Sequence, residues 1–313
     1  MKANAWPALP YGEWKDTALT LQLWMQIVGK IRLAQTPWLN HSWHVPLYVT
    51  SRGLTTSPIA WQDGAFEIDF DFIDHVLWLR SSSGAVRRVN LNPMTVAAFH
   101  DAVMAELKQL GITVTIDGMP NEIVGAVPFV QDHVHQDYDR DAAHQFWRIL
   151  LSSHLVLSHF RTAFLGKASP VHFFWGSFDL AVTRFSGRKA PLHPGGVPHL
   201  ADNVTREAYS HEVSSAGFWP GGGGVIDEPT YYSYAYPTPA GFAEAKVKPA
   251  AASFNTTLGE FVLPYDAVRT APDPAGMLMD FLQSTYQAAA DLGKWDRSAL
   301  ECQLGVERRP RQV

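Results

Sequence analysis

The polar residues with the most chemical potential lie inside an otherwise apolar stretch, VHFFWGSFDLAVTRFSGR, which spans residues 171–188. Large apolar side chains occur at both its odd and its even positions, so we predict a single strand that is buried on both faces. Ser177 and Asp179 would share one face, whereas His172 and Arg184 would share the other. An unpaired charge in such a place costs several kcal/mol, so each group needs a partner from another element or from a ligand.

These residues could form an active site or a ligand pocket. His172 would act as a general base or a metal ligand, Asp179 would orient it, and Arg184 would anchor the substrate. Arg184 and Arg188, together with Trp175, favour a small molecule with an anionic group and an aromatic or apolar body. Two alternatives stay open, namely a closed network of buried hydrogen bonds and a bulge at the glycine that changes which residues share a face.

A second candidate is the motif YSHEVSS, in which His211 and Glu212 are adjacent. Such a pair can supply acid–base catalysis or two metal ligands. Neighbouring residues of a strand point to opposite faces, so only one of the two should reach a pocket. We predict that His211 is the one with a catalytic or metal-binding role.

Two acidic segments could hold a metal ion, which gives an alternative function as a metal-dependent hydrolase or oxygenase. The segment QDHVHQDYDRDAAH combines an H-x-H pair with four aspartates, and FEIDFDF carries three carboxylates at every second position. The first segment also suits the beginning of a helix, where Asp caps the N-terminus. The second is typical of a sheet with one solvated face, on which Arg87 and Arg88 could neutralise the carboxylates. The cofactor is therefore unknown from the sequence.

The first half of the chain offers a counterpart to the 171–188 stretch in NHSWHVPLYVTSRGLTTS, which contains His44 and Arg52. If the two halves pack about a pseudo-twofold axis, the two segments would lie opposite each other. His44 and Arg52 would then bind the ligand, and Trp43 and Trp175 would be the walls of the pocket. This prediction depends on an internal duplication of the chain.

The hydrophobic periodicity predicts the elements that must position these residues. Helical patterns cover residues 17–33, 95–111, 141–165 and 275–293, and strand patterns cover residues 43–54, 66–72, 75–80, 85–91, 112–117, 171–188, 210–221, 230–237 and 259–268. The order of helix, strands and helix therefore occurs twice, which indicates a duplication. We predict an α+β fold of two related halves, residues 1–135 and 136–313, each an antiparallel sheet with flanking helices, packed as one compact unit.

Several longer strings resemble a single bacterial family of about the same chain length, which is known only as a domain of unknown function. The resemblance rests on GKIRLAQTPWLNHSWHVPLYVTSRGLTTSPI, GKASPVHFFWGSFDLAVTRFSGR, YSHEVSSAGFWPGG and YYSYAYPTP, and it covers nearly the whole chain. It implies one intact unit. It implies no activity, cofactor or catalytic residue.

The composition argues against several classes of function. The net charge is −5 and no long basic run occurs, so we expect no nucleic-acid partner. The only cysteine, Cys302, allows no intramolecular disulfide. No apolar run approaches the ~18 residues of a membrane span, and residues 1–14 lack the apolar core of a signal peptide. We therefore expect no membrane contact and a cytoplasmic location.

Four functions stay open. The lead hypothesis is a pocket, lined by aromatic, His, Asp and Arg side chains, that binds a small molecule and could process it. The 11 tryptophans of the chain suit such a pocket as well as a core. The alternatives are the metal-dependent enzyme, a non-catalytic binding protein, and a purely structural or interaction protein.

Overall fold

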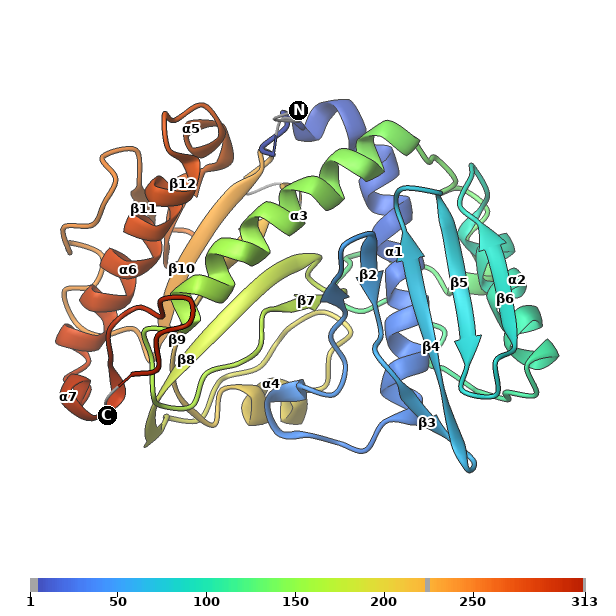
Figure 1. Cartoon of the computed structure of the whole chain (residues 1–313), viewed down its shortest axis with the longest axis horizontal. Coiled ribbons are helices and arrows are strands. Elements are labelled where there is room, and N and C mark those ends of the chain that lie inside the picture. Colours follow the sequence, from blue (N-terminus) through green and yellow to red (C-terminus); the bar gives the residue numbers. More distant parts are fainter. Residues whose placement is uncertain (1–4, 223–225, 312–313) are drawn as a thin grey trace.

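The structure is a computed structural model that describes residues 5–222 and 226–311. Within these residues the chain forms seven α-helices and two antiparallel sheets of six strands each (Figure 1). This arrangement confirms the predicted α+β class with two sheet-containing halves. Of the helices in the described residues, none is both long and apolar enough to cross a membrane.

The first half contains the first sheet and two long helices. Helix α1 (Tyr11–Gln35) precedes the sheet, and α2 (Val96–Gln109) follows it. The strands pair in the order β1-β2-β4-β5-β6, with β3 paired to β4. They are β1 (Tyr48–Val49), β2 (Gly53–Thr55), β3 (Ile59–Trp61), β4 (Gly64–Asp71), β5 (Val76–Ser81) and β6 (Val86–Asn90). The strands predicted over residues 75–80 and 85–91 are confirmed, and they pair antiparallel as β5 and β6.

The second half begins with α3 (Arg140–Arg161) and contains the second sheet, in the order β11-β12-β10-β9-β8-β7. Its strands are β7 (His172–Phe174), β8 (Asp179–Lys189), β9 (His211–Trp219), β10 (Thr230–Tyr236), β11 (Ser253–Asn255) and β12 (Glu260–Pro264). The remaining helices are α4 (Asp202–Ala208), α5 (Tyr265–Arg269), α6 (Pro274–Leu292) and α7 (Arg297–Leu300). Two 3-10 turns, η1 (Asn40–Ser42) and η2 (Phe129–Gln131), lie in the connecting segments.

The two sheets share one buried core rather than two separate ones. Helix α3 crosses the second sheet diagonally toward α1, and α6 covers the same face of that sheet (Figure 1). The sheets are joined directly by an antiparallel bridge between Leu47, just before β1, and Phe173 of β7. The opposite face of the second sheet, which we call the cavity face, is left for the segments around η1 and α4.

The prediction of one strand over residues 171–188 is wrong, because the chain reverses direction in the middle of the stretch. Residues 175–178 form a turn in which the amide of Phe178 donates to the carbonyl of Phe174 at 2.8 Å. The reversal pairs His172 with Ala181. His172 therefore shares the cavity face with Asp179, and Arg184 lies on the other face.

The predicted strand over residues 112–117 is also absent from the structure. The alternation itself is real, since Ile112 is buried and Val114 and Ile116 pack against the core. Within residues 5–222 and 226–311 no strand pairs with the segment, so the alternation reflects burial of every second side chain without a sheet ladder.

The internal duplication stays a prediction, as does the boundary at residue 135. Each half has a helix, six strands and a further helix in this order, although α4 lies between β8 and β9 in the second half. The segments that the duplication equates differ in structure, however, because residues 40–46 form η1 and turns while residues 172–174 form a strand.

Candidate functional site

A cavity of about 330 Å³ lies over the cavity face of the second sheet. The strands β8, β9 and β10 and the turn between β7 and β8 form its floor. The η1 segment and α4 form the walls that cover this floor. Most of the lining is aromatic or aliphatic, including Leu33, Trp38, Trp43, Phe174 and Val204. A concave, mainly apolar space with a few convergent polar groups is the usual form of a small-molecule site.

Strand register gathers the polar groups of the cavity into rows. Ser215 of β9 pairs with Thr183 of β8 on one side and with Tyr234 of β10 on the other. The hydroxyls of Thr183 and Ser215 are 2.9 Å apart, and those of Tyr209 and Tyr234 are 2.8 Å apart. Paired residues of antiparallel strands point to the same face, so Thr183, Ser215 and Tyr234 all face the cavity. Tyr209 reaches it from the end of α4.

Asp179, the first residue of β8, is fixed at the floor of the cavity by two hydroxyl donors. Ser177 donates to its Oδ1 at 2.5 Å, and the phenol of Tyr232 donates to its Oδ2. Gly217 makes room for the ring of Tyr232, because a Cβ at that position would lie 2.6 Å from the phenol oxygen. Burial raises the pKa of Asp179, and the hydrogen bonds from Ser177 and Tyr232 oppose this rise.

Glu122 enters the same cavity from a loop of the first half. Its backbone has φ = +62°, a strained conformation for a residue with a side chain, and its amide donates to the carbonyl of Pro198 at 2.9 Å. Gln26 of α1 clamps the preceding residue with two hydrogen bonds, of 2.7 and 2.9 Å, to the backbone of Asn121. A Cβ at Gly176 would lie only 2.1 Å from Glu122 Oε1, so the absent side chain leaves room for the carboxyl.

The Glu122 carboxyl has no hydrogen-bond partner among the described residues, unlike Asp179. Burial raises the pKa of Glu122 to about 7, and the neighbouring charge of Asp179 adds to this rise. Near neutral pH the group is therefore close to half protonated.

A third carboxyl belongs to a second cavity of about 340 Å³ that adjoins the first. Ser233 of β10 pairs with Phe261, which places Glu260 of β12 beside Tyr234. Burial raises the pKa of Glu260 to about 7, again with a contribution from the charge of Asp179.

The two cavities share six lining residues. Their shared residues are Glu122, Ser177, Asp179, Tyr209, Tyr232 and Tyr234. Among the described residues that line either cavity, none is a lysine or an arginine. The carboxyls are thus surrounded mainly by aromatic rings and hydroxyls, without a lysine or arginine in the lining to compensate them.

Four of the residues predicted for the site do line the first cavity, namely Trp43, Trp175, Ser177 and Asp179. The indole of Trp175 donates to the carbonyl of Val45 at 2.9 Å and so ties the β7–β8 turn to the first half of the chain. The ring lies against Gly29 of α1, where a Cβ would be 2.2 Å from the indole nitrogen.

The two arginines expected to bind an anion lie outside the cavity. The guanidinium of Arg184 is 1% exposed on the opposite face of the sheet, with its Cζ 3.5 Å from the ring centre of Phe160 and 4.3 Å from that of Tyr286. Arg188 pairs with Glu212 at 2.6 Å and donates to the carbonyl of Lys294 at 2.9 Å. Both therefore have structural partners.

The predicted histidines do not form a catalytic group with Asp179. His172 is buried among the rings of Trp43, Tyr48 and Phe174, and neither ring nitrogen has a hydrogen-bond partner among the described residues. Burial lowers the pKa of His172 to about 3, so the ring is neutral. His211 is half-buried and is not part of the cavity lining. Its ring centre lies 5.9 Å from that of His41, a residue that does line the cavity.

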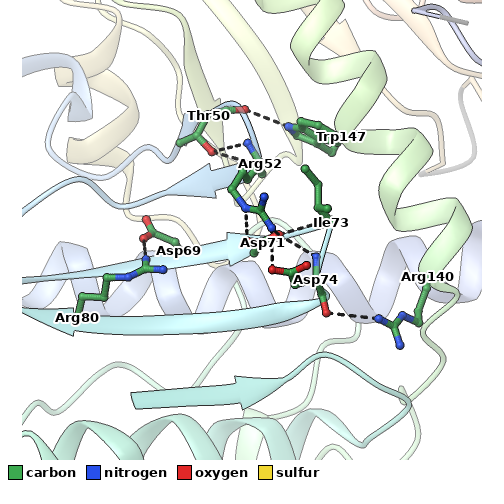
Figure 2. Close-up of polar contacts among 10 residues, drawn as sticks. Thr50, Arg52, Asp69, Asp71, Ile73, Asp74, Arg80, Arg140 and Trp147 are labelled. Carbon is green, nitrogen blue, oxygen red and sulfur yellow. Dashed lines mark hydrogen bonds and ion pairs between the residues drawn. The ribbon is translucent and has the colours of Figure 1, made fainter. Parts of the chain in front are cut away.

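His44 and Arg52, the site residues predicted in the first half, lie in two different environments. His44 is buried, and its Nδ1 accepts a hydrogen bond from the amide of Leu39 at 3.2 Å. Arg52 lies on the first sheet and pairs with Asp71 at 2.6 Å and with Asp74 at 2.7 Å (Figure 2). Arg52 therefore stabilises the β4–β5 turn, and neither residue lines the cavities.

Neither acidic segment assembles a metal site. In the part of the chain that the structure describes, no three His, Cys, Asp or Glu side chains lie close enough together to hold a metal ion. His135 instead contacts Asp132 at 2.7 Å. On β4, Asp69 pairs with Arg80 rather than with the arginines expected at positions 87 and 88 (Figure 2).

Sequence reasoning missed Glu122, Glu260 and the tyrosines of the site. The period-two spacing in TYYSYAYP does place Tyr232 and Tyr234 on one face, and this signal could have found them. No local pattern marks Glu122, because contacts with Gln26 and Pro198, far away in sequence, determine its position.

Fold and site together define an α+β protein with a carboxyl-bearing aromatic cavity on one of its two sheets. The chain belongs to the Family of unknown function (DUF5996), whose model matches residues 6–302. No curated protein and no solved structure matches the chain. The function of this family is unknown, so the site is the only basis for a functional proposal.

Proposed function

We propose that this protein binds a small organic cation, with an aromatic or apolar body, in the cavity on its second sheet. One observation carries the proposal: Glu122 and Asp179 face an aromatic cavity whose described lining contains neither lysine nor arginine. A carboxylate that is removed from water is costly without a compensating charge. A bound ammonium group would supply that charge.

The aromatic walls support the same ligand class. The faces of Trp and Tyr rings attract cations, and this attraction adds to the pairing with a carboxylate. The rings of Trp43 and Trp175 would contact the apolar body of the ligand. The anion expected from the sequence rested on Arg184 and Arg188, and both of these are held by other partners.

The two carboxyls would have different roles. Both oxygens of Asp179 are occupied by the hydroxyls of Ser177 and Tyr232, so this carboxyl would shape the site from a fixed position. Glu122 makes no hydrogen bond to a described side chain, so its oxygens can accept directly from the ammonium group. A hydrogen bond between charged groups contributes about 1.5–3 kcal/mol.

The test is a calorimetric titration with two probes of equal size and opposite charge, benzylamine and benzoate, at pH 7.5. We expect benzylamine to bind and benzoate not to bind. Glu122→Gln and Asp179→Asn should each weaken benzylamine binding about ten-fold or more, a change of ~1.4 kcal/mol. Glu244→Gln, at an exposed position away from both cavities, is the matched control. Tighter binding of benzoate, or unchanged affinity in Glu122→Gln, would overturn the proposal.

One further observation favours a catalytic use of the same cavity. The raised pKa of Glu122, about 7, beside the hydroxyl-bonded Asp179 sets a proton donor next to a carboxylate, as in general acid–base sites. As a second candidate we propose hydrolysis of a glycosidic bond, since sugars stack on tryptophan faces. Nitrophenyl glycosides test it. Release of nitrophenol that falls about 100-fold in Glu122→Gln would support it, and no release above buffer would remove it.

A further inference from the structure

The two cavities lie next to each other and meet along a shared set of residues, which we call the junction. They have similar volumes, about 330 and 340 Å³, and six residues belong to the lining of both. These shared residues include Asp179 and Glu122, so the carboxyls lie at the junction and not at the end of either cavity. A ligand held at the junction therefore has space on both sides.

The carboxyls are distributed unevenly along this site. Glu122 and Asp179 line both cavities, whereas Glu260 lines only the second one. The Glu260 side chain also lacks a hydrogen-bond partner among the described residues. A single ammonium group at the junction would leave Glu260, a partly buried carboxyl, without a compensating charge.

We infer that the site takes a linear dication, an aliphatic diamine or polyamine, that extends through the junction into the second cavity. One ammonium group lies between Glu122 and Asp179, and the other lies at Glu260. The inference rests on the proposed function, because it assumes that the junction binds a cation.

The walls between these carboxyls suit a methylene chain. Tyr232 and Tyr234 present their rings along β10, and Leu258 and Val262 add aliphatic surface in the second cavity. Methylene groups gain from contact with such surfaces, whereas an ammonium group gains from the carboxyls and the ring faces. Along the site, carboxyl groups therefore lie at the junction and at Glu260, with apolar surface between them.

A matched pair of ligands tests the inference, namely hexane-1,6-diamine and hexylamine, titrated calorimetrically at pH 8. At this pH the amines are charged, and Glu122 and Glu260 are largely ionised because their pKa values are about 7. We expect the diamine to bind about ten-fold or more tightly than hexylamine. Glu260→Gln should abolish this advantage and leave hexylamine binding within about two-fold of the wild type, and Glu244→Gln should change neither affinity.

The failures of the two proposals are distinguishable. Equal affinity of the two amines for the wild type, or an equal loss of both in Glu260→Gln, would overturn the dication and leave the cation site standing. Binding of neither amine would overturn both. If Glu260→Gln does not fold, the ratio of the two affinities for the wild-type protein still decides the question.

Discussion

The carboxyl groups of the two sheets have opposite surroundings. On the first sheet, Asp69 pairs with Arg80, and Asp71 pairs with Arg52 at 2.6 Å (Figure 2). On the cavity face of the second sheet, the side chains that donate to Asp179 are the hydroxyls of Ser177 and Tyr232, and Glu122 has no hydrogen-bond partner among the described residues.

The pKa values follow this difference. Burial tends to raise the pKa of Asp71, but hydrogen bonds from Arg52 and from the amides of Asp74 and Ile73 outweigh it and lower the value. For Glu122 the effect of burial is unopposed, and the pKa rises to about 7. A carboxylate that the protein compensates itself stabilises the fold, whereas one left uncompensated beside a cavity is available to a ligand.

The largest expected effect is on the first sheet. Asp71→Ala removes the acceptor for Arg52 and for the amides of Ile73 and Asp74, at 2.9 and 3.0 Å, which hold the β4–β5 turn. We expect a loss of about 3 kcal/mol in the free energy of unfolding, because the buried Asp71 carboxylate accepts all of these hydrogen bonds at once. Urea denaturation measures this loss. Benzylamine affinity at 25 °C should stay unchanged.

Asp74→Asn is the matched control, because the Asp74 side chain is 62% exposed and its pair with Arg52 is screened by water. It should change the stability by less than about 0.5 kcal/mol. If Asp71→Ala were equally mild, the carboxylates of the first sheet would not be structural.

The second effect is on the pH dependence of stability. The pKa of Glu122 rises from 4.5 to about 7 on folding, so the folded state binds the proton more tightly. Protonated Glu122 therefore contributes to the free energy of unfolding, fully below about pH 4.5, and this contribution is lost as the pH rises through 7. Glu122→Gln has no titrating group at this position, so its stability does not fall in this pH range for the same reason. The variant should therefore gain on the order of 1 kcal/mol relative to the wild type between pH 5 and pH 8, measured by urea denaturation. Parallel pH curves for the two proteins would contradict this.

The third prediction tests whether ligand affinity depends on the position of the Glu122 carboxyl when its charge is kept. In Gly176→Ala the new methyl group would lie 2.1 Å from Glu122 Oε1, so the flexible carboxyl must move. We expect a several-fold loss of benzylamine affinity in calorimetry with a nearly unchanged melting temperature. Gly118→Ala, where a Cβ would meet nothing within 4 Å, is the control. Unchanged affinity in Gly176→Ala would show that the place of Glu122 is not critical.

The smallest effect concerns His172, the base predicted from the sequence. Its ring is neutral, buried and without a hydrogen-bond partner among the described residues, so a leucine can replace it in an aromatic environment. His172→Leu should keep benzylamine affinity and change the unfolding free energy by less than about 1 kcal/mol. A large loss of binding with a normal melting curve would restore a functional role for His172.

Periodic patterns predicted the long elements of the fold because they depend on local burial. The helices α3 and α6 and the strands β9 and β10 lie where the apolar periodicity placed them. The turn at residues 175–178 was missed, because WGSF offers large apolar residues where a polar turn sequence is usual. Phe178 adopts φ = +63° there, a conformation that its type does not favour.

The candidate site was predictable only in part, for the same reason. Asp179 could be singled out as a charge within an apolar stretch. Its partner Tyr232 depends on strand pairing through β9, and Glu122 depends on the clamp by Gln26 from a helix nearly a hundred residues away in sequence. Such contacts are determined by the tertiary fold, and no local pattern encodes them.

The most direct test of the central claim counts the protons released when a cation binds. Benzylamine is titrated at pH 6 in two buffers of different ionisation enthalpy, where Glu122 is mostly protonated because its pKa is about 7. If the ligand replaces the proton as the compensating charge, binding releases up to about one proton, and the release disappears in Glu122→Gln. Binding without proton release, or release that Glu122→Gln leaves intact, would contradict the claim that this carboxyl is the uncompensated group that the ligand neutralises.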